Sequence, residues 1–492
     1  MTDIARLTDY TIDERPNFID IRTERIDPIV SSSFRYQFRL DPAAFMDRNS
    51  MLLFKVNAKD AAAAARGLRL NCFNGALSCL KRIEVQIGDH SVQRIDNVNE
   101  WATLNSLYSV APEVQDKLMS HYVKNQLKYE VLSANGAGPG DLTGVIKPNN
   151  VTSGFNYGQS DSGAGAAVVS NQLTVAGTAQ NHLIGVPLGM ICPMIANKEF
   201  PLFLFQDQKF IITLDFESDA SRFCNDKSAN NLAGGERMAA AVDAVTYSDV
   251  HLLVDYLIYP ARVMDGVREA TQKKGGFNFE FVNVETIQKT INPTTANTEQ
   301  SQDLRLNLIN MECHYVQMIK QLPDSKFDKV LLNQRCDSVS IQESQFNVNG
   351  IDSFPEGFQN SPLEFYNQTS YTLGRDLAVP KPLCVADTNT QASLLSPSDQ
   401  GLSGKYAPIC LDLRNGEPTV RGGGRPINEY PIRHLYKRKP HGEVTKSDLV
   451  GTPVVGQDEV GTLNVNYFCG VTRIVNVMAM PSGGNSVVVS DM

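Results

Sequence analysis

The sequence lacks the motifs that carry most enzyme chemistry. Its 492 residues contain no HExxH pair of zinc ligands, no GxxxxGK[ST] phosphate loop and no GxGxxG turn after a predicted strand. The seven histidines are scattered, and no two of them stand at metal-ligand spacing. The sequence therefore predicts no catalytic residue, no cofactor or cofactor-binding residue and no metal ligand, and we expect a protein that is not an enzyme.

Signs of export and of a membrane anchor are also missing. The nine cysteines are odd in number and form no CxxC pair, so we expect reduced thiols that act as small apolar side chains. No apolar signal segment opens the chain, and no run approaches the roughly 20 apolar residues of a membrane helix. We therefore expect a protein that folds in a reducing compartment.

An excess of positive charge is missing as well. The formal net charge is −9, and acidic residues outnumber the four arginines of the first thirty residues. Neutralising nucleic-acid phosphates requires clustered Lys and Arg, so the composition argues against broad contact with a genome. One basic run stands out, with Tyr436 inside it: Arg433, His434, Lys437, Arg438 and Lys439. It could contact a genome, a membrane surface or an acidic neighbour, or it could be a solvated loop.

What the sequence has in abundance is alternation of apolar and polar residues, the pattern of half-buried β-strands. The pattern is clearest at 34–40, at 210–216 and in a hairpin candidate at 80–95, whose turn is Gly88-Asp89. Further strands are predicted at 52–56, 250–258, 277–281, 304–308, 315–319, 409–413, 463–467 and 472–478. Helical spacing occurs at 97–128, and a short helix is predicted within 361–373.

The predicted strands fall into two halves of similar length. Residues 1–30 are polar and mixed in charge, and we expect an N-terminal arm there. Residues 31–260 make up the first half, which contains a long loop rich in Gly and Ser at 132–181. A connector at 261–275 precedes an aromatic strand that opens the second half, 276–492, as another opens the first. Short strands separated by polar loops are typical of β-sandwiches and jelly rolls.

Two stretches of the chain resemble a known family. Residues 184–217, IGVPLGMICPMIANKEFPLFLFQDQKFIITLDFE, contain two apolar-Pro-Leu elements, Val186-Pro187-Leu188 and Phe200-Pro201-Leu202, before an alternating strand. Residues 79–107, CLKRIEVQIGDHSVQRIDNVNEWATLNSL, combine the hairpin with a helical stretch. Both are similar to double jelly-roll major capsid proteins, in particular to those of Polinton-like viruses and virophages.

The resemblance implies an all-β fold of two consecutive eight-stranded jelly rolls, with helical and loop insertions. It implies a structural protein whose copies assemble into trimeric, pseudo-hexameric capsomers that tile an icosahedral viral shell. The expected partners are the chain itself, penton and minor capsid proteins, and an internal membrane or the genome, with no small-molecule substrate. The expected location is the capsid of a virion assembled inside the host cell.

Two alternatives stay open. Jelly rolls host many functions, so the chain could be a carbohydrate-binding or carbohydrate-active β-sandwich, or a minor or spike protein of a virion. Sugar-binding proteins usually display aromatic side chains for stacking, whereas the single tryptophan here, Trp101, falls within a predicted helix. Two halves of similar size favour a major capsid protein.

Overall fold

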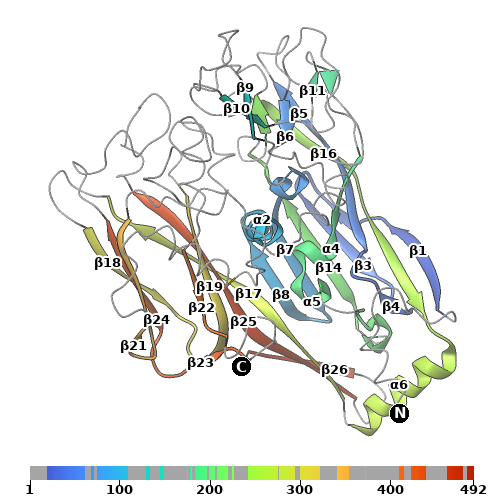
Figure 1. Ribbon diagram of the computed structural model, residues 1–492. Helices are drawn as coiled ribbons and strands as arrows, with labels where there is room; N and C mark the ends of the chain where they lie inside the picture. The colour runs from blue at the N-terminus through green and yellow to red at the C-terminus, as the bar shows by residue number, and fades with distance from the viewer. Residues whose placement is uncertain are drawn as a thin grey trace.

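The computed structural model shows two β-structures side by side, at the right and the left of Figure 1. The structure describes residues 19–60, 68–70, 75–108, 129–132, 145–148, 174–175, 178–179, 183–196, 199–205, 208–219, 224–226, 242–274, 276–293, 300–321, 341–353, 372, 409–414, 423–438, 462–479 and 485–491. Among them, no helix is both long and apolar enough to cross a membrane.

The first β-structure consists of two antiparallel sheets. Its strands are β1 (Asp20–Ile26), β2 (Val30–Ser31), β3 (Arg35–Leu40), β4 (Phe45–Met46), β5 (Met51–Asp60), β7 (Leu80–Ile87), β8 (His90–Asp96), β13 (Leu183–Pro187), β14 (Phe210–Phe216) and β16 (Val242–Ile258). The β16 sheet has the order β1-β16-β5-β13, with β4 also paired to β16. The β14 sheet has the order β2-β3-β14-β7-β8.

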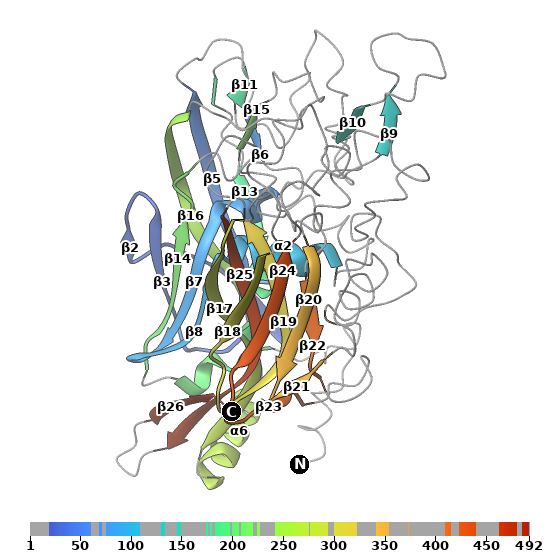
Figure 2. The same cartoon turned by 90° about the vertical axis from the view of Figure 1, so that its left-hand side faces the viewer.

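The second β-structure also consists of two antiparallel sheets. Its strands are β17 (Phe277–Ile291), β18 (Gln300–Leu306), β19 (Met311–Gln321), β20 (Ile341–Val348), β21 (Ile351–Asp352), β22 (Ile409–Asp412), β23 (Arg425–Ile427), β24 (Ile432–Arg438), β25 (Leu463–Ala479) and β26 (Asn485–Asp491). The β25 sheet has the order β17-β25-β19-β22, with β23 on β19 and β26 on β25. The β24 sheet, which faces the viewer in Figure 2, has the order β18-β24-β20-β21.

The two β-structures share one topology. We number the principal strands of the first along the chain, as β1, β3, β5, β7, β8, β13, β14 and β16, and those of the second as β17 to β22, β24 and β25. In each β-structure, one sheet then has the order 1-8-3-6 and the other the order 2-7-4-5. This pairing of two sheets is the jelly roll. The prediction of an all-β chain with two consecutive eight-stranded jelly rolls is therefore confirmed.

Alternation along the strands decides which side chains enter each core. In β3, Tyr36, Phe38 and Leu40 are buried while Arg35 and Arg39 are exposed. Because successive strand residues point to opposite faces of a sheet, one face packs and the other is left to solvent or to a partner. Fully burying one such apolar side chain stabilises the fold by about 1.5–3 kcal/mol.

Helices and small hairpins occupy the connections between strands. The helical segments are η1 (Gly75–Cys79), α2 (Val98–Tyr108), α4 (Leu188–Ile191), α5 (Pro193–Ala196), η3 (Leu202–Phe205) and α6 (Ala261–Lys273). At the top of Figure 1, β9 (Tyr129–Leu132) pairs with β10 (Val145–Pro148), β11 (Thr174–Val175) with β12 (Thr178–Ala179), and β6 (Leu68–Leu70) with β15 (Cys224–Asp226). At the bottom, α6 joins β16 to β17.

Several local predictions are confirmed. The predicted hairpin is β7 and β8, and Gly88 in its turn has a φ of 62°, a left-handed conformation that favours glycine. The predicted helix at 97–128 is α2 over 98–108, and residues 109–128 lie outside the described residues. The predicted helix within 361–373 also lies outside them, apart from Thr372.

Other segments differ in detail from the pattern of the sequence. The described residues of the expected arm, 1–30, include β1, which pairs with β16 over the whole of β1, and Arg25 forms an ion pair with Asp249. The two strands predicted at 463–467 and 472–478 are one strand, β25, because the residues between them stay in register with β17. The described residues of the predicted loop 132–181 include the paired strands β9 to β12.

The face of β14 offers a test of the first core. Ile212 is fully buried, whereas Ile211 on the same strand is half-buried, points the other way and lies opposite Arg39. We expect Ile212→Asp to abolish soluble assembled protein, because an unpaired buried carboxylate is costly. The control Ile211→Asp should stay soluble. Soluble yield and circular dichroism measure both, and a well-folded Ile212→Asp protein would contradict this account of the core.

Candidate functional site

Among the described residues, the junction between the two jelly rolls buries apolar, aromatic and hydrogen-bonding side chains of both halves together. The hydrophobic cluster of the first jelly roll continues into the second through Phe281, Val284, Ile319, Phe468, Val475, Val477 and Val487. The second jelly roll keeps a separate cluster of its own, which includes Val316 and Tyr467. The two halves are therefore joined by a continuous apolar core, in addition to the connector α6.

The outer face of the β25 sheet supplies one side of the junction. On β25, Tyr467 and Cys469 point into the second core, so Asn466 and Phe468 point away from it. On β19, Val316 and Met318 point inward, and Tyr315 and Ile319 point outward. In this outward set, Tyr315 and Asn466 contact α2 of the first jelly roll, which lies between the two β-structures in Figure 1, and β8 lies against β17 and β26.

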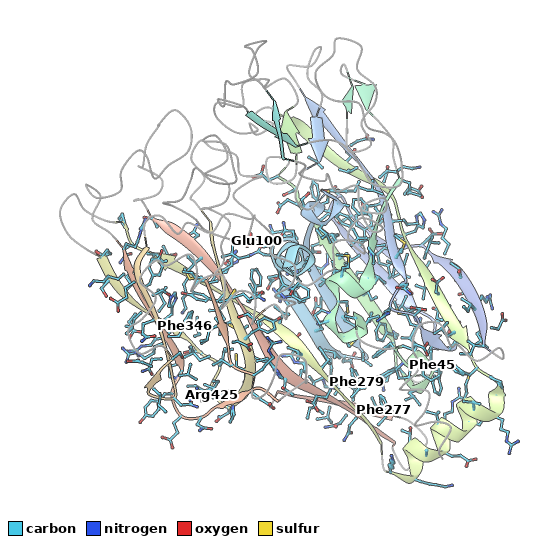
Figure 3. The ribbon with its side chains drawn as sticks, in the orientation of Figure 1. Phe45, Glu100, Phe277, Phe279, Phe346 and Arg425 are labelled. Carbon is cyan, nitrogen blue, oxygen red and sulfur yellow. The ribbon has the colours of Figure 1, made fainter. Side chains whose placement is uncertain are left out.

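Hydrogen bonds from α2 orient this packing. The Asn466 Nδ2 group donates to Glu100 Oε2 at 2.8 Å, and only 1% of Glu100 is exposed. The Trp101 Nε1–H donates to the Tyr315 hydroxyl at 3.3 Å. Glu100 is labelled at this position between the jelly rolls in Figure 3. Because these polar groups are buried, a displaced jelly roll would break these hydrogen bonds, at a cost of about 1–3 kcal/mol each.

A glycine on β25 makes room for this contact. Gly470 lies beside Tyr315 in the β19–β25 register, and a Cβ added at Gly470 would overlap the Tyr315 ring. The ring therefore lies across the backbone of β25 and reaches Trp101. Burial raises the pKa of the Tyr315 hydroxyl above its ordinary value, so the group stays protonated.

Farther down the junction, β8 binds the second jelly roll through polar groups. Arg473 donates from one guanidinium nitrogen to the Val92 carbonyl at 3.0 Å and from another to Glu285 at 2.8 Å. The amides of Gln93 and Asn283 meet at 3.5 Å and are fully buried. The Arg473–Val92 and Gln93–Asn283 contacts join the two jelly rolls across 381 and 190 positions of the sequence, whereas Glu285 lies in the second jelly roll together with Arg473.

Aromatic rings close the lower end of the junction. Phe279 on β17 packs edge-on against Phe200, with ring centroids 5.4 Å apart, and against Phe205, at 6.3 Å. Phe277 and Phe279 are labelled in Figure 3, where β17 and β25 extend beneath the first jelly roll. Phe200 belongs to the second apolar-Pro-Leu element of the sequence, so that element joins the two jelly rolls.

The basic run of the sequence is not a solvated loop. It forms β24, a central strand of the β24 sheet, so its side chains alternate between the two faces. Arg433 faces outward and pairs with Asp303 at 2.7 Å, and Lys437 lies 3.9 Å from Glu343. Lys439 lies outside the described residues.

The other members of the run are buried. His434 lies 2.7 Å from Ser344 Oγ and 2.7 Å from the Tyr467 hydroxyl, and it stacks on Phe346. Arg438 is also buried and donates to the Asn292 carbonyl at 2.7 Å. The interpretation of this run as one basic surface patch is therefore wrong.

Five cysteines whose side chains the structure describes agree with the expected reduced, apolar thiols. Cys79, Cys192, Cys313, Cys410 and Cys469 are free and buried. Burial raises the pKa of the Cys192 and Cys313 thiols to about 12, so they stay protonated. In the part of the chain that the structure describes, no three His, Cys, Asp or Glu side chains come together in a way that could hold a metal ion.

Little in the sequence predicts the residues at the junction. Glu100 and Asn466 are 366 positions apart, and only Glu100 falls within a stretch, 79–107, that carries the family resemblance. The single signal was a carboxylate, Glu100, in a helical stretch, 98–108, with no other charged residue, because buried carboxylates need partners.

The fold is that of the double jelly-roll major capsid proteins of viruses. No family model and no curated protein sequence matches the chain. Solved structures do match it, among them the PBCV-1 protein VP54 fitted into a reconstruction of the virophage Sputnik. That structure has a TM-score of 0.58 and 11% identity, over 98% of this chain and 99% of that one.

Two virophage structures are similar over nearly the whole chain as well. The Sputnik virophage structure gives a TM-score of 0.52 at 10% identity, over 98% of this chain and 90% of that one. The mavirus major capsid protein gives 0.50 at 9% identity, over 98% and 92%. At such identities the likeness shows the fold alone.

Removing the Asn466 amide tests the polar contact at the junction. We expect Asn466→Ala to lower the free energy of unfolding by about 1–3 kcal/mol, because the buried Glu100 carboxylate loses a donor. Asn464→Ala, at an exposed position of the same strand, is the matched control. Urea unfolding measures both variants, and equal midpoints would show that the contact with Glu100 contributes nothing.

Proposed function

We propose that the chain is a major capsid protein, which assembles as a trimer into pseudo-hexameric capsomers of an icosahedral viral shell. The observation that carries the proposal is the presence of two jelly rolls of identical topology in one chain, packed rigidly by a shared core. Three such chains in a ring present six similar jelly rolls, so a threefold ring can occupy a sixfold position of a lattice. The similar solved structures are viral capsid proteins, which supports this role.

The rigid junction supports a structural role for the chain. A shell subunit must hold its two jelly rolls at a constant angle, and the junction buries apolar, aromatic and polar groups together. We propose that the chain is not an enzyme and that it resides in the virion capsid. Its partners would be further copies of itself, penton and minor capsid proteins, and an internal membrane or the genome.

We also propose that each jelly roll is a domain. The first domain extends from β1, rather than from residue 31, to residue 260, and the second spans 276–492. The helix α6 lies between them at 261–273, which supports a connector at 261–275.

No observation on the described residues favours the carbohydrate alternative. Trp101 is 7% exposed and hydrogen-bonded to Tyr315, so its ring is not available to stack on a sugar.

The oligomeric state of the purified chain tests the proposal. We expect a stable trimer of about 162.6 kDa, three times the chain mass of 54.2 kDa. Light scattering across micromolar concentrations measures the mass, and electron microscopy of the same sample should show particles with a hexagonal outline. A monomer throughout that concentration range would contradict the proposed trimeric capsomer.

A further inference from the structure

An open cavity of about 900 Å³ lies at one end of the outer face of the β14 sheet, where β3 and β7 begin and β8 and β14 end. The described residues that line it include four basic side chains and two carboxylates, four positive charges against two negative and so a net of +2: Arg35, Lys81, Arg82, Arg94, Asp96 and Asp215. The whole chain has a net charge of −9, so this cavity concentrates positive charge on an acidic protein.

The two carboxylates neutralise only part of this positive charge. Asp215 lies 3.6 Å from Arg35 and also forms an ion pair with Arg82. Asp96 lies 3.3 Å from Arg94 and 3.9 Å from Arg82. Two carboxylates are therefore shared among three guanidinium groups, which leaves one positive charge unmatched in addition to that of the lysine.

The rest of the lining supplies hydrogen-bond donors and an aromatic ring. Lys81 is exposed at the start of β7 and forms no ion pair with any residue that the structure describes. Ser32 and Ser218 place hydroxyl groups at the cavity, and the half-buried Phe34 lines it beside the arginines. Charged donors, neutral donors and an apolar surface therefore meet in one place.

Both jelly rolls contribute to the cavity. Thr286 and Gln288 on β17 line it, together with the residues of β3, β7, β8 and β14. The Thr286 hydroxyl donates to the Asp96 carbonyl at 3.1 Å, so β17 is held against the end of β8 at this point. A ligand bound here would contact both halves of the chain beside their junction, and binding to the folded chain alone would stabilise their arrangement.

We propose that this cavity binds a phosphate dianion, either free or as the monoester group of a small molecule. A phosphate monoester carries a charge of about −1.5 to −2 at pH 7, which matches the net charge of the lining. Guanidinium groups bind two phosphate oxygens at a time through parallel N–H donors. Arg35, Arg82 and Arg94 come from three different strands, β3, β7 and β8, and this arrangement suits a tetrahedral group better than a planar carboxylate.

Charge and size favour a small ligand over a nucleic-acid strand. The net charge of −9 repels a long polyanion outside the cavity. The volume of about 900 Å³ falls in the range of small-molecule sites and exceeds what a phosphate group alone would fill. The ring of Phe34 offers a surface against which an apolar or aromatic body attached to the phosphate can pack.

Calorimetric titration of the purified full chain with phenyl phosphate and with inorganic phosphate tests the proposal. We expect one site per chain, and we expect the double variant Lys81→Gln/Arg94→Gln to bind about tenfold or more weakly, because two charge-assisted contacts are lost. The matched control is Arg39→Gln, at an exposed arginine of β3 that does not line the cavity, which should bind as the wild type does. Tighter binding of phenyl phosphate identifies a monoester as the ligand, and equal or weaker binding identifies free phosphate.

A gain of affinity gives a second readout that a misfolded variant cannot imitate. Asp96→Asn removes a competing carboxylate whose side chain is 42% exposed, so the chain should fold and bind phosphate about fivefold more tightly. No saturable binding of either probe by the wild type would overturn the proposal, as would an equal loss of affinity in Arg39→Gln and in the double variant. Tighter binding of a single-stranded oligonucleotide than of phenyl phosphate would overturn it in favour of a nucleic-acid strand.

Discussion

The packing of α2 and β8 against the outer face of the β25 sheet is the constraint on which the rest of the molecule depends. The apolar face of a sheet must pack against another layer, and inside each jelly roll the two sheets cover each other. The junction adds a further layer, in which apolar residues of both halves form one cluster. Relative motion of domains is expected unless the interface is large and apolar, and this interface is apolar and continuous with a core.

The polar groups at the junction define the angle between the two jelly rolls more than they stabilise the packing. Apolar packing alone tolerates small rotations, because it has no preferred direction. The hydrogen bonds of Asn466 with Glu100 and of Arg473 with the Val92 carbonyl join the two jelly rolls and are directional, so both break if the jelly rolls shift. The contact of Arg473 with Glu285 lies within the second jelly roll and orients the guanidinium. A subunit of a regular lattice needs such a fixed angle, since a small error would be repeated at every position.

Because both jelly rolls have the same topology, the outer face of the β16 sheet corresponds to the outer face of the β25 sheet. The outer face of the β25 sheet packs against the first jelly roll, whereas Leu183 and Ile21, at the edges of the outer face of the β16 sheet, are 47% and 51% exposed. The likeness of these faces is not visible in residue types, since Asn466 and Phe468 have no counterparts in a shared motif with Leu253 or Met51. It follows from strand order and from which side of each strand is packed.

The sequence by itself determined many of the strands and which of their faces are buried. Alternation at 34–40, 80–95 and 210–216 predicted β3, the β7–β8 hairpin and β14, because a period of two puts one set of side chains in the core. The apolar-Pro-Leu elements and the helix around Trp101 pointed to the double jelly roll. These signals are local, so they can be read from neighbouring residues.

Only the tertiary structure decided what polar residues do. Arg438 and His434 are buried in β24, while β1 is a strand in spite of its polar composition, because each finds partners on strands far away in the sequence. The partners of Glu100 and Arg473 were likewise hidden, since hydrogen bonds across 366 and 381 positions leave no periodic trace. A polar side chain is buried or exposed according to its partners, and those partners are brought together only when the two jelly rolls pack.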